Sequence, residues 1–302
     1  MDISLVAGVI LYESTTFLLL PSKTSAGVIT YEATGSHPKM PELAEVFYFA
    51  QCWVPGRGLR IVNVEAHEKS RVFRYCDIAA LRRGMIGAKL KTSLTHGKQM
   101  LFEFSGGRWL GVHLGMTGEL SIKAEPYAPT KHDHLVLHTK SQVLVFNDPR
   151  QFGKISYDEG KSPPAWWRDL PPQPMDEGFT QELVVCILQR HARLPLKALL
   201  LDQRYFPGIG NWMADEVMWQ MKLPPHLAAG SLTEKQTREL RRTLRKVCDV
   251  GLKTIGVDWS DPPKSWLFTH RWKRSKNCPR CGMKLKHESL RGRTACWCPV
   301  CQ

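Results

Sequence analysis

Hydrophobic residues recur at helical spacing where the regular part of the chain begins. Between Pro41 and Val54 they stand at positions 43, 46, 47, 50, 53 and 54, which is the spacing of one helix face. Pro41 suits the first position of such a helix, because no backbone N–H donor is needed there. The Pro55-Gly56 pair then stops it. The pattern therefore predicts a helix over 41–54.

Residues 59–157 change to an alternation of apolar and polar positions, interrupted by glycine pairs and Asn/Asp clusters. Short alternating runs between polar turns are typical of antiparallel strands. The predicted strands cover 59–64, 99–104, 109–114, 120–122, 135–137, 143–146 and 154–157. Together they predict an antiparallel β-sandwich that follows the N-terminal helix.

A proline-rich stretch separates this region from one with helical periodicity. Its prolines stand at 163, 164, 171, 172 and 174, and we expect a domain boundary there. The later helices are predicted at 180–190, 195–203, 211–221 and 233–253, followed by a loop over 254–277. The fold class is therefore α+β. We expect a β-sandwich domain over 40–160, a linker over 161–175, a helical domain over 176–265 and a cysteine-rich module over 266–302.

The charge of the chain is strongly positive and unevenly placed. The net charge is +14, and residues 231–302 hold 17 Lys/Arg against 6 Asp/Glu, which is +11. A basic surface attracts polyanions, and nucleic acid is the commonest of them. No apolar run reaches the roughly 18 residues that would span a bilayer, so no membrane partner is expected.

Residues 1–39 do not share the regular pattern. Val6–Leu20 is fairly apolar, but it contains Glu13 and lacks a basic segment before it, which makes a poor secretory signal. Met40 stands directly before Pro41. We therefore interpret 1–39 as a mis-called start or an extension outside the fold.

Cysteines form a metal pattern near the C-terminus. Cys278-x2-Cys281 and Cys298-x2-Cys301 are separated by sixteen residues, and this spacing lets four thiolates close one tetrahedral structural zinc site. Four unrelated thiols are the alternative. Cys296 is left out of the set. Such a site indicates a reducing compartment, so we expect a cytoplasmic protein, associated with the bacterial nucleoid if it binds DNA.

Basic residues occupy the hairpin between the two cysteine pairs. They are Lys284, Lys286, Arg291 and Arg293. On a rigid metal-closed module they would suit phosphate contacts, although a merely solvated face would look the same.

A glycine turn precedes one of the predicted helices. Gly208 and Gly210 permit tight backbone geometry, and Asn211 is placed to cap the helix that follows. The exposed N–H groups of such a turn bind anions, including DNA phosphate. An ordinary helical hairpin is the alternative interpretation.

Several separated motifs together resemble one family, the formamidopyrimidine-DNA glycosylases of the Fpg/Nei group, of MutM type. The motifs are Pro41-Glu-Leu-Ala-Glu-Val46, His113-Leu-Gly-Met-Thr-Gly118, Lys131-His-Asp-His134, Asn147-Asp-Pro-Arg-Gln-Phe-Gly153, Gly208-Ile-Gly-Asn211 and the terminal cysteines. The resemblance covers 40–302. It implies an N-terminal helix on a β-sandwich, a helix-two-turn-helix domain and a zinc finger, with damaged double-stranded DNA in the cleft between them. It also implies excision of an oxidised base followed by strand cleavage through β,δ-elimination.

The resemblance also implies a role for each matched residue. Pro41 would be the nucleophile, Glu42 the general acid/base, and Lys98 and Arg293 would hold phosphate at the reacting nucleotide. The DNA-binding set would comprise Glu45 beside the sugar, His113, Asn211 on the backbone, and Met116, Arg150 and Phe152 in the gap left by the extruded nucleotide.

Each of these residues also has an ordinary interpretation. Pro41-Glu42 is a good helix start, Lys98 is a typical solvated edge residue, and Met116 and Phe152 would fit a hydrophobic core. The sequence also departs from the family pattern. Ala44 replaces the usual second proline, and 254–277 does not follow the usual loop around the damaged base. We expect a monomer that prefers 8-oxoguanine and formamidopyrimidines, with oxidised pyrimidines as the alternative. A non-catalytic zinc-containing DNA-binding protein is the alternative if 1–39 is retained.

Overall fold

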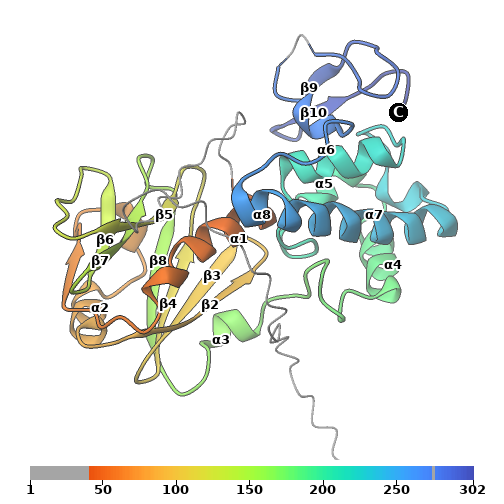
Figure 1. The fold of residues 1–302 in the computed structure, drawn as a ribbon. Coiled ribbons are helices and arrows are strands. Elements are labelled where there is room, and N and C mark those ends of the chain that lie inside the picture. The colour runs from red at the N-terminus through yellow and green to blue at the C-terminus, as the bar shows by residue number, and fades with distance from the viewer. Residues whose placement is uncertain (1–40, 274–275) are drawn as a thin grey trace, which may run out of the picture.

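The computed structural model describes residues 41–273 and 276–302, so the interpretation of residues 1–39 lies outside it. Two antiparallel sheets form one half of the molecule, helices form the other, and a small hairpin module lies beyond the helices (Figure 1). Helix α1 lies where the two halves meet. The predicted α+β class with its order of parts is confirmed.

Helix α1 spans Leu43–Cys52 and is followed by a 3-10 turn, η1, at Val54–Gly56. Its N-cap residue is Glu42, whose backbone is extended, so Pro41 lies before the helix. The prediction that Pro41 occupies the first helical position is therefore wrong. The capping interaction explains the later start, because the Glu45 side chain accepts a hydrogen bond from the backbone nitrogen of Glu42 (3.0 Å).

The eight strands of the β-half form two four-stranded sheets. One sheet has the order β2-β3-β4-β8 and the other β1-β6-β7-β5, with every neighbouring pair antiparallel. The strands are β1 (Asn63–Ala66), β2 (Leu90–His96), β3 (Gln99–Phe104), β4 (Arg108–His113), β5 (Glu119–Ala124), β6 (Asp133–His138), β7 (Gln142–Asn147) and β8 (Lys154–Glu159). Large apolar side chains such as Phe102 and Phe146 are fully buried in one core.

Three elements of this half differ from the prediction. Helix α2 (Ile78–Met85) lies within the region expected to be purely β, and its start is capped by Asp77, which accepts from the backbone nitrogen of Ala80 (2.9 Å). Strand β2 was not predicted, because its Lys-Thr-Ser-rich sequence hides the alternation. The strand expected over 59–64 starts only at Asn63.

The helical half follows the proline-rich stretch, which itself contains a short helix, α3 (Ala165–Arg168). The other helices are α4 (Gln181–Arg190), α5 (Leu196–Leu200), α6 (Asn211–Gln220), α7 (Glu234–Lys253) and α8 (Ile255–Asp258), with 3-10 turns η2 (Arg71–Phe73), η3 (Ala229–Ser231) and η4 (Leu267–Thr269) along the chain. Segment 254–277 is therefore not simply a loop. Its Trp259 packs on α1, with ring centroids 4.6 Å from Tyr48 and 5.2 Å from Phe49.

The C-terminal module pairs β9 (Lys286–Leu290) with β10 (Arg293–Trp297) and packs on α6 through Trp219, Leu267 and Leu285. A buried ion network reinforces this contact. Asp215 of α6 pairs with Lys197 of α5 and with Arg271 (2.7 Å), and it also accepts from the backbone nitrogen of Cys296 (3.2 Å). Lys197 in turn donates to the carbonyl oxygen of Thr294 (2.6 Å). Within the described residues, no helix is long and apolar enough to cross a membrane.

This network leads to a prediction about stability. Asp215→Asn leaves two buried cations without their counter-charge, so we expect the free energy of unfolding to fall by about 3–5 kcal/mol. Denaturant unfolding measures it. Asp249→Asn is the control, because the Asp249–Lys253 pair is exposed and its loss should cost less than about 1 kcal/mol. Equal losses in the two variants would contradict the proposed importance of the network.

Candidate functional site

Three segments far apart in the sequence meet at one place: the start of α1, the turn between β2 and β3, and the glycine turn before α6. Leu43 donates from its backbone nitrogen to the carbonyl oxygen of Gly208 (3.1 Å). A Cβ built on Gly97 would stand 2.8 Å from the nitrogen of Gly208, and one built on Gly210 would stand 2.2 Å from the Glu42 carboxyl carbon. Any larger residue would push these segments apart, so the glycines permit the approach.

The Glu42 side chain caps helix α6. Its two carboxylate oxygens accept hydrogen bonds from the backbone nitrogens of Trp212 (2.9 Å) and Met213 (3.2 Å). A carboxylate at a helix N-terminus satisfies free N–H groups and complements the helix dipole. The prediction that Asn211 caps this helix is wrong: Gly210 is the N-cap residue, and Asn211 is the first helical residue, with its Oδ1 atom buried and unpaired.

Glu45 is buried beside Glu42 and also bonds to α6, accepting from the indole nitrogen of Trp212 (2.9 Å). Burial and the adjacent Glu42 carboxylate raise the pKa of Glu45 to about 8. Burial raises the pKa of Glu42 as well, but Lys98 and the two backbone donors oppose that rise. Burial thus favours the protonated form of both carboxyls, while Lys98 and the two backbone donors favour the charged form of Glu42.

Lys98 lies in the turn between β2 and β3 and faces this carboxylate pair. Burial lowers its pKa, the charges of Glu42 and Glu45 raise it, and the charge of Arg293 lowers it again. The structure therefore brings a lysine of the β-half within electrostatic reach of both carboxyls and of an arginine from the C-terminal hairpin. Arg293 is exposed at the start of β10, where a ligand can reach it.

His113 ends strand β4 next to these groups. Burial lowers its pKa to about 4, and the charges of Lys98, Arg74 and Lys154 act in the same direction. The ring is thus neutral at pH 7. Its Nδ1 atom accepts a hydrogen bond from the backbone nitrogen of Gly115 (3.0 Å), which places the proton on Nε2 as a donor.

Met116, Arg150 and Phe152 lie on two neighbouring turns. Asp148 links these turns, because it accepts from the Thr117 hydroxyl (2.6 Å) and from the backbone nitrogen of Gly153 (2.7 Å). Phe152 is 44% exposed, and the Arg150 guanidinium lies 4.7 Å from its ring centroid. The alternative that Phe152 is a core residue is therefore wrong, whereas Met116 is half-buried.

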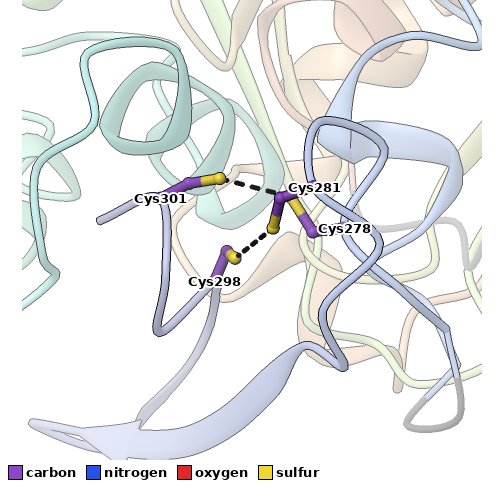
Figure 2. Close-up of side chains that lie close together, drawn as sticks. All are labelled: Cys278, Cys281, Cys298 and Cys301. Atoms are coloured by element: carbon purple, nitrogen blue, oxygen red, sulfur yellow. Dashed lines mark hydrogen bonds between the residues drawn. The ribbon is translucent and has the colours of Figure 1, made fainter.

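The four cysteines of the predicted metal site come together in the C-terminal module (Figure 2). Their sulfurs all lie within 4.8 Å of one another, with 3.9 Å between Cys278 and Cys301 and 3.4 Å between Cys281 and Cys298. Four thiolates about 2.3 Å from one tetrahedral ion would stand roughly 3.8 Å apart. The cluster can therefore hold a metal ion. Cys296 is buried outside it, as expected.

Two glutamines that the sequence analysis did not select hold the turns of the site. Gln173 accepts from the backbone nitrogen of Gly97 (2.7 Å), and Gln203 accepts from that of Gly208 (3.0 Å). Each glutamine side chain thus holds a turn of the site without being one of the turn's glycines. Nothing in their sequence spacing distinguishes them from ordinary loop glutamines.

Comparison with known proteins gives matches along most of the chain. The family model of the formamidopyrimidine-DNA glycosylase N-terminal domain matches residues 40–155, and the model of the formamidopyrimidine-DNA glycosylase H2TH domain matches residues 170–260. The formamidopyrimidine-DNA glycosylase of Carboxydothermus hydrogenoformans is 32% identical over 272 residues, covering 87% of this chain and 100% of the relative. That of Thermus thermophilus is 32% identical over 278 residues, covering 88% and 98%.

Solved structures of the Lactococcus lactis enzyme share this architecture. The complex with DNA containing an AP site matches with a TM-score of 0.76 and 25% identity, covering 86% of this chain and 99% of that one. The complex with DNA containing an oxidised pyrimidine matches with a TM-score of 0.77 and 25% identity, covering 87% and 99%. The match therefore spans the β-half, the helical half and their arrangement.

Proposed function

The chain belongs to the formamidopyrimidine-DNA glycosylase family, and from this membership we propose that it repairs DNA by excising oxidised purines and cleaving the strand. The observation that carries the proposal is the meeting of Pro41-Glu42, Lys98 and the Gly208–Asn211 turn at one place. Related enzymes bearing this name match nearly the whole regular sequence. Chemistry and DNA binding would thus share one site between the two halves.

Pro41 supplies the reactive amine in this proposal when it is the first residue of the chain. A nucleotide turned out of the duplex exposes C1′ of its sugar. The amine lone pair forms a bond to C1′, and the glycosidic electron pair leaves with the base. Glu42 takes the amine proton and passes it to the ring oxygen as the sugar opens to an iminium. Loss of a 2′ proton then expels the 3′ phosphate, and a second elimination expels the 5′ phosphate.

Basic and apolar side chains around the site would hold the DNA. Lys98, Arg293 and the side-chain amide of Asn211 would offer phosphate partners from three different segments. Glu45 would lie beside the sugar, and the neutral His113 would donate from Nε2. Phe152 and Met116 would fill the space left by the extruded nucleotide, with Arg150 available to the orphaned base. The exposure of Phe152 beside a cation supports this role.

Zinc is the metal that we propose for the cysteine cluster, since four thiolates favour it strongly. The ion would stiffen the hairpin that presents Arg293. It supplies no reacting group in this proposal.

Replacing one metal ligand tests this role. Cys298→Ser should reduce the zinc content well below one per chain and weaken DNA binding about tenfold, because Arg293 loses its fixed position. Zinc analysis and DNA titration at constant salt measure both effects. Cys186→Ser, an exposed thiol on α4, is the matched control and should change neither. Unchanged zinc in Cys298→Ser would contradict the ligand assignment.

The lesion preference is tested on matched duplexes. One carries a single 8-oxoguanine, one an oxidised pyrimidine and one no lesion. We expect the protein starting at Pro41 to release base fastest from the first. Faster release of the pyrimidine would favour the alternative substrate, which a solved complex of the Lactococcus lactis relative contains. DNA binding without base release would instead favour a non-catalytic DNA-binding protein.

A further inference from the structure

An exposed tyrosine lies close to two cations outside the site described so far. Tyr75 is 74% exposed, and its ring centroid lies 5.7 Å from the Arg74 guanidinium and 5.2 Å from the Lys154 ammonium. Two positive charges near one exposed ring create a positive local potential, which attracts anions. The arrangement therefore favours an anionic ligand with a face that can pack on an aromatic ring.

Hydrogen bonds fix this cluster to the loop that carries Phe152. Arg74 donates to the carbonyl oxygen of Gly153 (2.7 Å) and to that of Arg71 (3.0 Å). Gln151, in turn, accepts from the backbone nitrogen of Arg71 (3.0 Å). The turn before Tyr75 and the loop before β8 are thus joined by two hydrogen bonds, one through a side chain of each segment. These bonds fix the position of Tyr75 relative to Phe152.

The cluster is also continuous with the proposed active site. Lys154 begins β8 and pairs across the sheet with His113 at the end of β4. The charges of Lys98, Arg74 and Lys154 all act on that histidine. The two cations beside Tyr75 therefore lie within electrostatic reach of the same histidine as Lys98.

We propose that Tyr75, with Arg74 and Lys154, binds the sugar–phosphate backbone of the duplex arm on the Phe152 side of the lesion. This inference rests on the proposed function. The two cations would neutralise phosphate, the phenol hydroxyl would donate to a phosphate oxygen, and the ring would pack on a deoxyribose. The contact lies outside the reacting atoms and supports binding of the DNA rather than excision.

Three variants of the full chain test the contact in DNA titrations over a range of salt. Lys154→Ala should weaken binding to a lesion duplex several-fold and reduce the salt slope by about 1, as expected for one lost phosphate contact. Tyr75→Ala should weaken binding by a similar factor with little change in slope. Tyr75→Phe should lie between Tyr75→Ala and the unchanged protein. Lys91→Ala is the matched control, because Lys91 is exposed on β2 at the opposite edge of the same sheet.

Two shortened duplexes locate the contact. Each lacks most of the arm on one side of the lesion. Shortening the arm that contacts Tyr75 should abolish the difference in affinity between Tyr75→Ala and the unchanged protein. Shortening the other arm should preserve that difference. Affinities and salt slopes equal to those of Lys91→Ala, or equal losses on both shortened duplexes, would overturn the inference. If the unchanged protein shows no preference for the lesion duplex, the proposed function fails instead.

Discussion

A chain that begins at Pro41 will form a borohydride-stable covalent adduct with a lesion-containing duplex, whereas the 302-residue chain will form none. Borohydride reduces the iminium between enzyme and sugar to a stable amine, so it records the nucleophile directly. When a residue precedes Pro41, the nitrogen of Pro41 is a tertiary amide nitrogen, and its lone pair is delocalised into the preceding carbonyl group. The expected difference is therefore complete loss of the adduct.

The electrostatics of the site support an amine nucleophile near neutral pH. A terminal amine has an ordinary pKa near 8, so a useful fraction is neutral at pH 7. Pro41 directly precedes the N-cap of α1, where the positive end of the helix dipole disfavours a protonated amine. The Glu42 carboxylate acts in the opposite direction. Adduct formation should rise with pH until the amine is fully deprotonated.

A gain-of-function design gives the control within one protein. A full chain with a protease site placed directly before Pro41 should form no adduct until it is cleaved. After cleavage the adduct should appear. Intact mass confirms that Pro41 is then the first residue. An adduct from the uncleaved chain would assign the nucleophile to another amine, such as that of Lys98, and would overturn the role of Pro41.

Much of the fold follows from local patterns in the sequence. The helices α4, α6 and α7 lie within a residue or two of their predicted bounds. In α4 and α7 the apolar residues recur at helical spacing, whereas α6 is buried along nearly its whole length. Strand β3 matches its prediction fully. Helix α2 was missed because a two-turn helix has too few residues to establish a period among short strands.

The site was less predictable because its key contacts join distant parts of the chain. Motifs selected Glu42 and Asn211, but local rules assigned the helix cap to the asparagine. The cap comes instead from a glutamate 170 residues away, which bonds to Trp212. The Asp215–Lys197 pair is hidden for the same reason, since a charge in a helical sequence is normally read as solvent-facing.

The structural role of Glu42 changes what its substitution should do. Glu42→Gln should slow base excision by about 10²–10⁴-fold, the usual contribution of a general acid/base. The amide also has only one acceptor oxygen, so either the Trp212 or the Met213 backbone nitrogen loses its partner. We therefore expect a small loss of stability alongside the catalytic loss. Single-turnover base release under saturating enzyme measures the catalytic loss, and denaturant unfolding measures the stability loss.

A second substrate separates the two effects of Glu42→Gln. A duplex with an abasic site needs no departing base, and its open-chain aldehyde can react with the Pro41 amine directly. If Glu42 acts in proton transfer during excision, the variant should lose far more activity on the 8-oxoguanine duplex than on the abasic one. If it acts only as the cap of α6, a distorted site should impair both substrates equally. Unimpaired excision would show that Glu42 transfers no essential proton, whatever it contributes to the helix.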